Sequence, residues 1–341
     1  MIDSVPGKVL KLAGITMTLP RRKFLRLVAS TSVLSSLSQI ARAQVYPTRP
    51  IHLIVPFTPG GTTDIVARLV GQWLSERLGK PIVIENRPGA GTNVGTEVVV
   101  NATSDGYTVL VASVASAVNA TLYQNLNFNF RRDIAPIAGL IRTAYVMEVN
   151  QSVPVNTVPE FIAYAKANPG KINMASSGNG TGAHLSGELF NMVTGTNMIH
   201  VPYRGAAPAL VDLIAGQVQV QFASAPETIE YIRNGKLRAI GVTTSTRSAA
   251  LPEISAIGEF VSGYETSAWW GLCAPKITPP AIVERLSNET NAALADPALK
   301  ARLAALGADP MVMGSAEFGK LIADETEKWA KVIKFAGIKV E

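Results

Sequence analysis

The stretch that decides the fold reads Ile51-His52-Leu53-Ile54-Val55-Pro56-Phe57-Thr58-Pro59-Gly60-Gly61-Thr62-Thr63-Asp64. Residues 51–55 predict a buried strand, the residues rich in Pro and Gly at 56–61 predict a loop, and the apolar spacing of residues 62–78 predicts a helix. The first N–H groups of a helix have no partner within it, and glycine allows close approach to the backbone. We therefore expect either an anion-binding loop or a plain tight turn capped by Thr62, Thr63 or Asp64.

The same alternation of strand, loop and helix recurs along the chain. Further strands are expected at 82–85, 107–112, 145–150, 172–175, 198–201, 218–222 and 239–243, and helices at 92–101, 158–168, 183–194, 206–215, 282–306 and 315–335. Alternating strands and helices predict an α/β fold with parallel sheets. An extended segment at 266–274 returns to the first unit, so we predict two lobes and a ligand cleft between them. Lobe one comprises residues 44–145 and 263–341, and lobe two comprises residues 146–262.

Charge is distributed unevenly along the 341 residues. The chain carries 31 basic and 25 acidic residues, a formal net charge of +6. Residues 1–43 hold seven of the basic residues and one of the acidic ones, which leaves 24 of each in the remainder. No basic run with interleaved aromatic residues is present, which argues against a nucleic-acid partner.

The basic N-terminal region resembles an export signal. An apolar stretch at 27–40 is followed by Ala41-Arg42-Ala43, a pattern typical of a signal peptide over residues 1–43, cleaved before Gln44. The stretch is shorter than the ~20 residues that a membrane-spanning helix needs, so we expect no membrane anchor. Arg21-Arg22-Lys23-Phe24-Leu25 resembles a twin-arginine signal, with the general secretory route as the alternative. Cys273, the only cysteine, leaves no intramolecular disulfide.

A second loop with similar chemistry precedes the helix expected at 183–194. It reads Ser176-Ser177-Gly178-Asn179-Gly180-Thr181-Gly182, so hydroxyl groups and backbone N–H groups again gather before a helix. Two such loops facing each other suit a ligand with acceptor groups at both ends. Gly178, Gly180 and Ala183 have dinucleotide-motif spacing, but no acidic residue follows about 20 positions on, which disfavours a nucleotide cofactor.

The remaining candidates have two interpretations each. In the segment Val201-Pro202-Tyr203-Arg204-Gly205-Ala206-Ala207-Pro208, Tyr203 and Arg204 face the cleft as ligand or latch residues, or else Arg204 caps a helix or bridges the lobes. His52, His184 and His200 lack the spacing of metal ligands, so we expect no metal. Cys273 with His184 would be the nucleophile and base of an exported hydrolase, whereas the alternative interpretation makes both structural core residues.

These motifs together resemble a known family, the substrate-binding receptors of tripartite tricarboxylate transporters, or Bug family. The resemblance runs over nearly the whole chain after residue 43. Besides Pro59 to Asp64, it is carried by Tyr46-Pro47-Thr48-Arg49-Pro50, Val55-Pro56-Phe57, Glu85-Asn86-Arg87-Pro88-Gly89-Ala90-Gly91, Ser104-Asp105-Gly106-Tyr107-Thr108, His200 to Gly205 and Gly235-Lys236-Leu237-Arg238-Ala239.

The resemblance implies a monomeric periplasmic binding protein of the type II-like, two-lobed fold. It would capture a small carboxylate-bearing molecule without a cofactor or chemical change, for the membrane components of a transporter or for a sensor kinase. The implied ligand-binding residues are Phe57, Pro59, Gly60, Gly61, Thr62, Thr63, Asp64, Ser113, Ser176, Ser177, Gly178, Asn179, Gly180, Thr181, Tyr203, Arg204, Gly205, Ala206, Ala223 and Ser224.

One position departs from the family pattern. Phe222-Ala223-Ser224 stands where the family commonly has Phe-Asp-Asn, so the carboxylate that reads an amine or hydroxyl is missing at position 223. This departure puts an amino-acid ligand in doubt and favours a plain dicarboxylate or an aromatic acid.

The loop assignment predicts the effect of a substitution at Gly61. A Gly61→Val variant should fold but bind its ligand roughly tenfold or more weakly, because the branched side chain blocks close backbone approach. Titration calorimetry on folded protein measures the change. Unchanged affinity would refute the role given to this loop.

Overall fold

The computed structural model describes residues 10–12, 15–17, 46–123 and 125–338. The chain divides into a unit from Met1 to Thr48 and a unit from Arg49 to Glu341. In the first, β1 (Leu10–Leu12) pairs antiparallel with β2 (Ile15–Met17). The apolar stretch, the Ala41-Arg42-Ala43 pattern and the predicted cleavage before Gln44 lie outside the described residues. None of the helices in the described ranges combines the length and hydropathy needed to span a membrane.

A six-stranded mixed sheet forms the core of the first lobe, with strand order β13-β6-β12-β5-β3-β4. Its strands are β3 (Ile51–Val55), β4 (Ile82–Asn86), β5 (Thr108–Ser113), β6 (Ile134–Thr143), β12 (Ala268–Pro275) and β13 (Ala308–Pro310). The strands β4, β3 and β5 run parallel, as the alternation with helices predicts. The returning strand β12 lies antiparallel between β5 and β6 and therefore joins the C-terminal part of the chain to the first lobe.

A five-stranded sheet forms the core of the second lobe, with strand order β11-β7-β10-β8-β9. Its strands are β7 (Tyr145–Val149), β8 (Asn173–Ser176), β9 (Ile199–Pro202), β10 (Val220–Ser224) and β11 (Arg238–Val242). The strands β10, β8 and β9 are parallel, while β7 lies antiparallel to both β10 and β11. Each lobe therefore has its own parallel segment from which helices depart.

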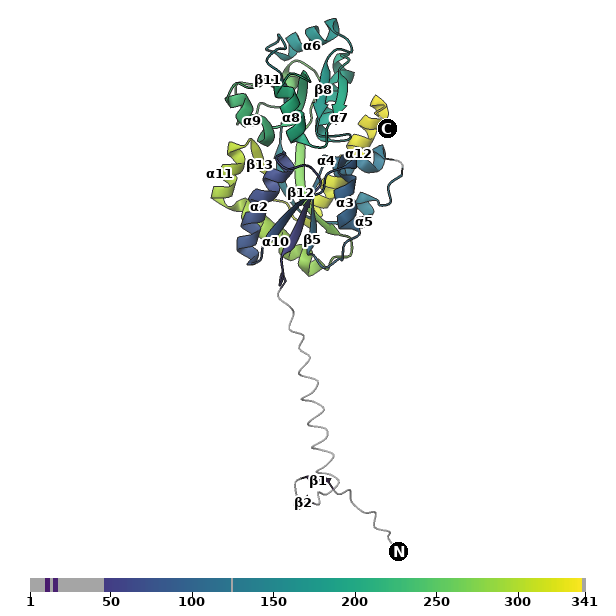
Figure 1. The fold of residues 1–341 in the computed structure, drawn as a ribbon, viewed down its shortest axis with the longest axis vertical. Helices are drawn as coiled ribbons and strands as arrows, with labels where there is room; N and C mark the ends of the chain where they lie inside the picture. The colour runs from purple at the N-terminus through teal and green to yellow at the C-terminus, as the bar shows by residue number, and fades with distance from the viewer. Residues whose placement is uncertain (1–9, 13–14, 18–45, 124, 339–341) are drawn as a thin grey trace. The chain divides into compact units, whose positions relative to one another are not determined.

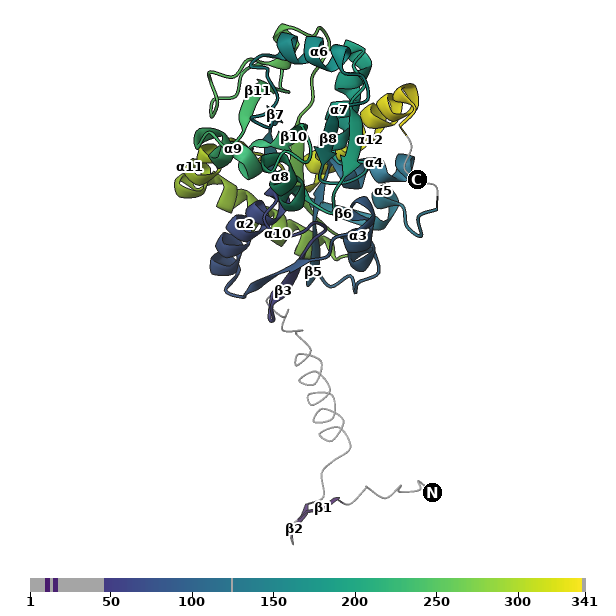
Figure 2. The same cartoon turned by 45° about the horizontal axis from the view of Figure 1, so that its top comes forward.

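Helices surround both sheets (Figures 1 and 2). Those of the first lobe are α2 (Thr62–Leu78), η2 (Ala90–Thr92), α3 (Asn93–Val100), α4 (Val114–Leu122), α5 (Phe130–Asp133), α10 (Pro280–Ala295), α11 (Pro297–Ala305) and α12 (Ser315–Ala336). Those that follow β7 and precede β12 are α6 (Val158–Ala167), α7 (Gly182–Thr194), α8 (Ala206–Ile214), α9 (Ala225–Arg233) and η3 (Ile257–Glu259). In Figure 1 the helices α6 to α9 gather at one end of the main unit, and α2, α3, α5 and α10 lie at the other.

The chain crosses between the two sheets twice, and one threonine links the crossings. Ala144 alone separates β6 from β7, and the second crossing occupies residues 243–267. Thr243 accepts the N–H of Tyr145 on its hydroxyl oxygen at 3.0 Å and donates that hydroxyl to the carbonyl of Thr266 at 2.9 Å. The two crossings are therefore held side by side, which is the arrangement that a hinge between lobes requires.

An apolar cluster of buried side chains fills one face of the first sheet. Fully buried aromatic side chains anchor it, and the rings of Trp269 and Phe318 meet edge to face with centroids 5.7 Å apart. Gly271 on β12 leaves room for Phe318, because a Cβ atom there would lie 2.1 Å from that ring. Burial of this kind is the main favourable term in folding, at about 25 cal/mol per Å² of apolar area.

The structure confirms most of the predicted elements and corrects others. The predicted helix at 62–78 has those bounds, and the return of residues 266–274 to the first sheet is confirmed as β12. The single helix expected at 282–306 is wrong, because Asp296 caps a new helix that begins at Pro297. The strand β6 and the helix α4 were not predicted. The residue limits of the two lobes stay a prediction, although Tyr145 already pairs within the second sheet.

Candidate functional site

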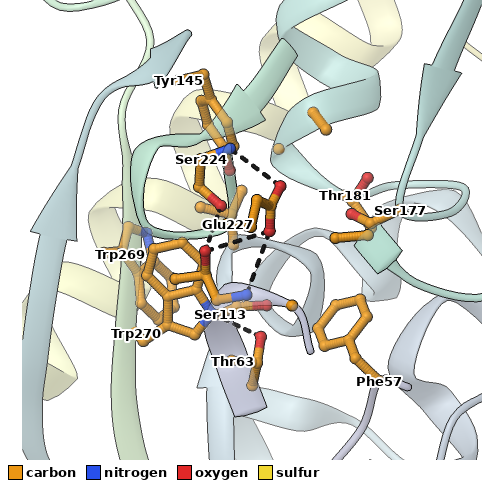
Figure 3. A pocket seen from close by; sticks show the side chains of 16 residues that line it. Phe57, Thr63, Ser113, Tyr145, Ser177, Thr181, Ser224, Glu227, Trp269 and Trp270 are labelled. Atoms are coloured by element: carbon orange, nitrogen blue, oxygen red, sulfur yellow. Dashed lines mark hydrogen bonds between the residues drawn. The ribbon is translucent and has the colours of Figure 1, made fainter. Parts of the chain in front are cut away.

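A small inner cavity of about 40 Å³ lies where elements of both lobes meet (Figure 3). It is lined by Phe57, Gly61, Thr62, Thr63, Ser113, Val114, Tyr145, Ser177, Thr181, Gly182, Ala183, Ala206, Ser224, Glu227, Trp269 and Trp270. This volume accommodates about three water molecules. Entry of a larger ligand therefore requires the lobes to move apart.

Five helices begin at this inner cavity. The lining includes residues in the first turns of α2, α4, α7 and α8, together with Ser224, the N-cap of α9. Each helix follows directly from a strand that runs parallel to a neighbour in its own sheet, namely β3, β5, β8, β9 and β10. Because ligands of open α/β sheets bind beyond the carboxyl ends of the strands, the topology alone brings these helix starts together.

The convergence of helix N-termini brings partial positive charges to the cavity without cationic side chains. No Lys, Arg or His is among the sixteen lining residues. The N-terminus of each helix carries a partial positive charge equivalent to roughly half an elementary charge and several N–H groups without intrahelical partners. Such an arrangement binds carboxylate or phosphate groups through backbone donors.

Asp64 holds the first loop in place from behind the cavity. Its carboxylate accepts the N–H of Gly60 at 3.0 Å, the amide of Asn86 at 3.0 Å and two bonds from the Arg68 guanidinium at 2.9 Å each. Burial acts to raise the pKa of Asp64, but the bonds from Arg68, Gly60 and Asn86 lower it on balance. Asp64 is therefore a positioning residue that stays ionised and fixes the start of α2.

Two stacked histidines hold the second loop. The rings of His184 and His200 lie 3.7 Å apart, with 12° between their planes. His184 accepts the N–H of Gly180 on Nδ1 at 3.2 Å, and His200 Nε2 lies 2.6 Å from the hydroxyl of Ser176. A nitrogen that accepts an N–H is unprotonated, so His184 is neutral in this arrangement. Burial lowers the pKa of His184 to about 3, helped by the adjacent His200, and burial lowers the pKa of His200 to about 4.

Glu227 contributes a carboxylate that the sequence patterns did not predict. It lies in the first turn of α9, and its Oε2 accepts both the N–H and the hydroxyl of Thr62 across the cleft, each at 3.2 Å. Its Oε1 accepts the N–H of Ser224 at 3.1 Å. Burial raises the pKa of Glu227, which is half-buried and lines the inner cavity. The signal that could have found it is the Ser-x-x-Glu capping box over Ser224 to Glu227.

Aromatic side chains close the inner cavity on the side of the first sheet. Trp270 donates its indole N–H to the hydroxyl of Thr63 at 2.8 Å, and Trp269 donates to Glu325 at 3.2 Å. The two tryptophans lie side by side in Figure 3, opposite Phe57. They come from β12, so the return of the chain to the first lobe completes the site.

A larger outer cavity of about 580 Å³ shares Phe57 and Ser177 with the inner one. It is lined by Pro56, Phe57, Pro88, Gly89, Ala90, Gly91, Thr92, Tyr123, Ser177, Gly178, Asn179, Pro202, Tyr203 and Arg204. Tyr203 donates its hydroxyl to Asp212 at 2.6 Å. Burial, together with this contact, raises the pKa of Tyr203 to about 12. Tyr203 and Arg204 thus line the outer cavity and not the inner one.

The predicted site residues divide into three groups. The inner cavity brings together Phe57, Gly61, Thr62, Thr63, Ser113, Ser177, Thr181, Ala206 and Ser224. The outer cavity adds Gly178, Asn179, Tyr203 and Arg204. Neither of these two cavities is lined by Pro59, Gly60, Asp64, Ser176, Gly180, Gly205 or Ala223. A ligand-binding role for each predicted residue stays a prediction, and Val114, Tyr145, Gly182, Ala183, Glu227, Trp269 and Trp270 were missed.

The hydrolase alternative loses its nucleophile. Cys273 is fully buried in the apolar core of the first lobe, where burial raises the pKa of its thiol. His184 is engaged by Gly180 and stacked on His200, and neither Cys273 nor His184 lines a cavity described above. Within the described ranges, no three His, Cys, Asp or Glu side chains gather closely enough to hold a metal ion.

The two lobes approach each other closely at two glycines. A Cβ atom built on Gly205 of the second lobe would lie 2.0 Å from the hydroxyl oxygen of Thr58 in the first. A Cβ atom on Gly61 would lie 3.2 Å from Cβ of Ala206 and 3.8 Å from Oε2 of Glu227. The hydroxyl groups of Thr62 and Ser224 also meet across the cleft at 2.8 Å. The absence of side chains at these glycines lets the lobes close.

These features define a class, the two-lobed solute-binding proteins with a cavity between the lobes. Comparison with known proteins gives the family. BugT of Bordetella pertussis is 36% identical over 324 residues, which cover 93% of this chain and 99% of that protein. A protein of R. palustris solved with adipate is 35% identical with a TM-score of 0.84, over 86% of this chain and 99% of that one. MatC from Rhodopseudomonas palustris, solved with bound malate, is 30% identical with a TM-score of 0.80, over 84% of this chain and 100% of that one.

The chain belongs to the tripartite tricarboxylate transporter family receptors, whose sequence profile matches residues 66–338. The family resemblance and the two-lobed fold of periplasmic binding proteins, both expected from the sequence, are confirmed. The family is one of solute-binding receptors and not of enzymes.

The buried histidine pair predicts how stability depends on pH. Because the pKa of each histidine is lower in the folded than in the unfolded protein, the unfolded state binds more protons between about pH 4 and 6.5, and stability falls as the pH falls through that window. Lowering the pH from 7 to 5 should cost on the order of 2 kcal/mol for each histidine. Urea unfolding at the two pH values measures this loss.

A matched variant separates the pair from other titrating groups. His184→Asn places an amide oxygen near the position of Nδ1, and His200→Gln places an amide near that of Nε2, so the double variant retains hydrogen-bonding groups that do not titrate. It should lose much less stability on acidification than the wild type. Equal losses in both proteins would contradict the assignment.

Proposed function

We propose that this chain is an exported periplasmic receptor that captures a small carboxylate-bearing molecule between its lobes and releases it chemically unchanged. The observation that carries the proposal is the convergence of five helix N-termini on one cavity whose lining has no cationic side chain. Backbone donors in a cavity of this kind suit a compact anion and supply no nucleophile or proton-transfer pair.

The ligand classes that we propose are a dicarboxylate and an aromatic acid. The relatives solved with adipate and with malate support a carboxylate-bearing ligand. The rings of Phe57, Tyr145 and Trp270 line the inner cavity and offer apolar surface for the body of the ligand. In this proposal, the first turns of α4, α7 and α8 hold the anionic group, and Ser113, Ser177 and Thr181 contribute hydroxyl groups.

The hinge that we propose consists of the two crossings between the sheets. Ligand entry needs the lobes to separate, since the inner cavity is about 40 Å³. Rotation about residue 144 and residues 243–267 would open the cleft while Thr243 keeps the two crossings together. The lobe limits predicted from the sequence, 44–145 with 263–341 and 146–262, agree with this placement of the hinge.

The partners that we propose are those expected of a receptor of this family. A receptor of a tripartite transporter delivers its ligand to membrane components, and a sensor kinase is the alternative recipient. We propose that residues 1–43 direct export and are removed before Gln44, so that the protein acts as a monomer free in the periplasm.

A ligand screen on the protein from Gln44 onward tests the proposal. The panel comprises dicarboxylates, aromatic acids, amino acids and nicotinates, read by thermal shift and by tryptophan fluorescence, since Trp269 and Trp270 line the inner cavity. A ligand that binds only the folded state raises the melting temperature, by an amount that grows with concentration above Kd. A selective shift by carboxylates, absent with the uncharged amides of the same acids, is expected. No shift with protein stripped of bound ligand by unfolding and refolding would contradict the proposal.

The close approach of the lobes at Gly205 predicts that one added methyl group there weakens ligand binding. Gly205→Ala should retain the fold but weaken ligand binding roughly tenfold or more, because the added Cβ meets the Thr58 hydroxyl before the lobes close. Adding Thr58→Ala removes that hydroxyl and should restore part of the affinity, which titration calorimetry measures as a coupling between the two sites. Additive losses from the two substitutions would argue against this contact.

A further inference from the structure

The N-terminus of α2 is already engaged by a carboxylate from the opposite lobe. Glu227 receives the N–H and the hydroxyl of Thr62, both at 3.2 Å, and the N–H of its own N-cap residue Ser224 at 3.1 Å. Figure 3 shows Glu227 among side chains contributed by both lobes. The position at which the first loop was expected to receive a ligand carboxylate is therefore taken by the protein itself.

Glu227 differs electrostatically from every other side chain of the inner cavity. Glu227 and Tyr145 are the only ionisable residues in the lining, and Glu227 takes part in no ion pair in the described part of the chain. An unpaired carboxylate in an enclosed site attracts hydrogen-bond donors and cations and repels a second anion. Its interaction with a ligand is strong because little water screens it.

The remaining helix starts leave a different place for the ligand anion. The first turns of α4, α7 and α8 line the same cavity, and the side chains of these turns carry no negative charge. A ligand carboxylate bound there would direct another part of the molecule toward Glu227. That second part of the ligand meets the carboxylate of Glu227, which accepts hydrogen bonds, and not a backbone N–H group.

We propose that Glu227 is a specificity-determining residue that accepts a hydrogen bond from a hydroxyl or ammonium group of the ligand and disfavours a second ionised carboxylate at that end. The inference rests on the proposed function and narrows it. Among carboxylate ligands it selects hydroxy and amino acids, including substituted aromatic acids, over fully ionised dicarboxylates.

Ligands matched in length test this selectivity directly. Titration calorimetry at neutral pH compares adipate with its ω-hydroxy and ω-amino monocarboxylate counterparts of the same chain length, and succinate with the corresponding short set. For at least one of the two chain lengths, either the hydroxy or the amino ligand should bind the wild type roughly tenfold or more tightly than the dicarboxylate of that length does. Dicarboxylates that bind as tightly as both counterparts at both lengths would overturn the proposal without any variant.

A Glu227→Gln variant tests whether this residue is the cause. The amide oxygen can still accept from Thr62 or Ser224, so closure is retained while the charge is removed. The preference for the amino ligand should fall roughly tenfold or more, and dicarboxylate binding should strengthen. Glu230→Gln, on the exposed side of the same helix, is the matched control and should keep the wild-type order. If the ratio of the affinities for the amino ligand and the dicarboxylate stays within about twofold of the wild-type ratio in Glu227→Gln, the assignment is overturned.

Failure of the proposed function is distinguishable from failure of this inference. The uncharged diol of the same chain length is titrated alongside. If no carboxylate binds wild-type protein or variant better than the diol, the anion-binding function itself fails. If carboxylates bind but their order does not depend on residue 227, only the selectivity fails.

Discussion

The structure depends on a constraint of parallel strands, whose carboxyl ends all point to one edge of a sheet. Five strands across the two sheets, β3, β5, β8, β9 and β10, lead directly into helices whose starts line one small cavity. The partial charges at these starts would repel one another if nothing negative lay between them. Glu227 supplies part of that negative charge from within the chain, and a bound anion would supply the rest. Lobe closure, which brings Glu227 to Thr62, and binding of an anion would therefore both reduce the repulsion between the helix N-termini.

How far the sequence predicts this structure differs from element to element. The bounds of α2 follow from an uninterrupted apolar period that begins after Gly60-Gly61 and ends before Gly79, so local signals suffice. The strand β6 contains Pro136 and Gly139, residues that oppose strand assignment, and it forms because β12 and β13 pair with it from more than 100 residues away. Neither pattern nor propensity encodes such pairing.

The candidate site likewise has residues that local sequence signals indicate and residues that only the folded chain brings together. The two loops that contribute Gly61 to Thr63 and Ser177 to Thr181 stand out as Gly-rich segments between a strand and a helix, and both reach the inner cavity. Glu227, Trp269 and Trp270 belong to a helix turn and a strand that read as ordinary structural elements. They become site residues only through the second crossing and the closure of the lobes, which a linear pattern does not express.

The proposed recognition through buried backbone dipoles has a consequence for the ionic surroundings in which the protein works. A lysine or arginine at a surface would carry a counterion atmosphere, and its attraction for an anion would weaken steeply as salt increases. The N–H groups at the starts of α4, α7 and α8 line a cavity between the lobes, where fewer ions reach them. An anion bound there as proposed would leave only when the lobes open, and its release should depend little on the salt content of the medium. The proposed site is therefore suited to a fluid whose ionic composition changes.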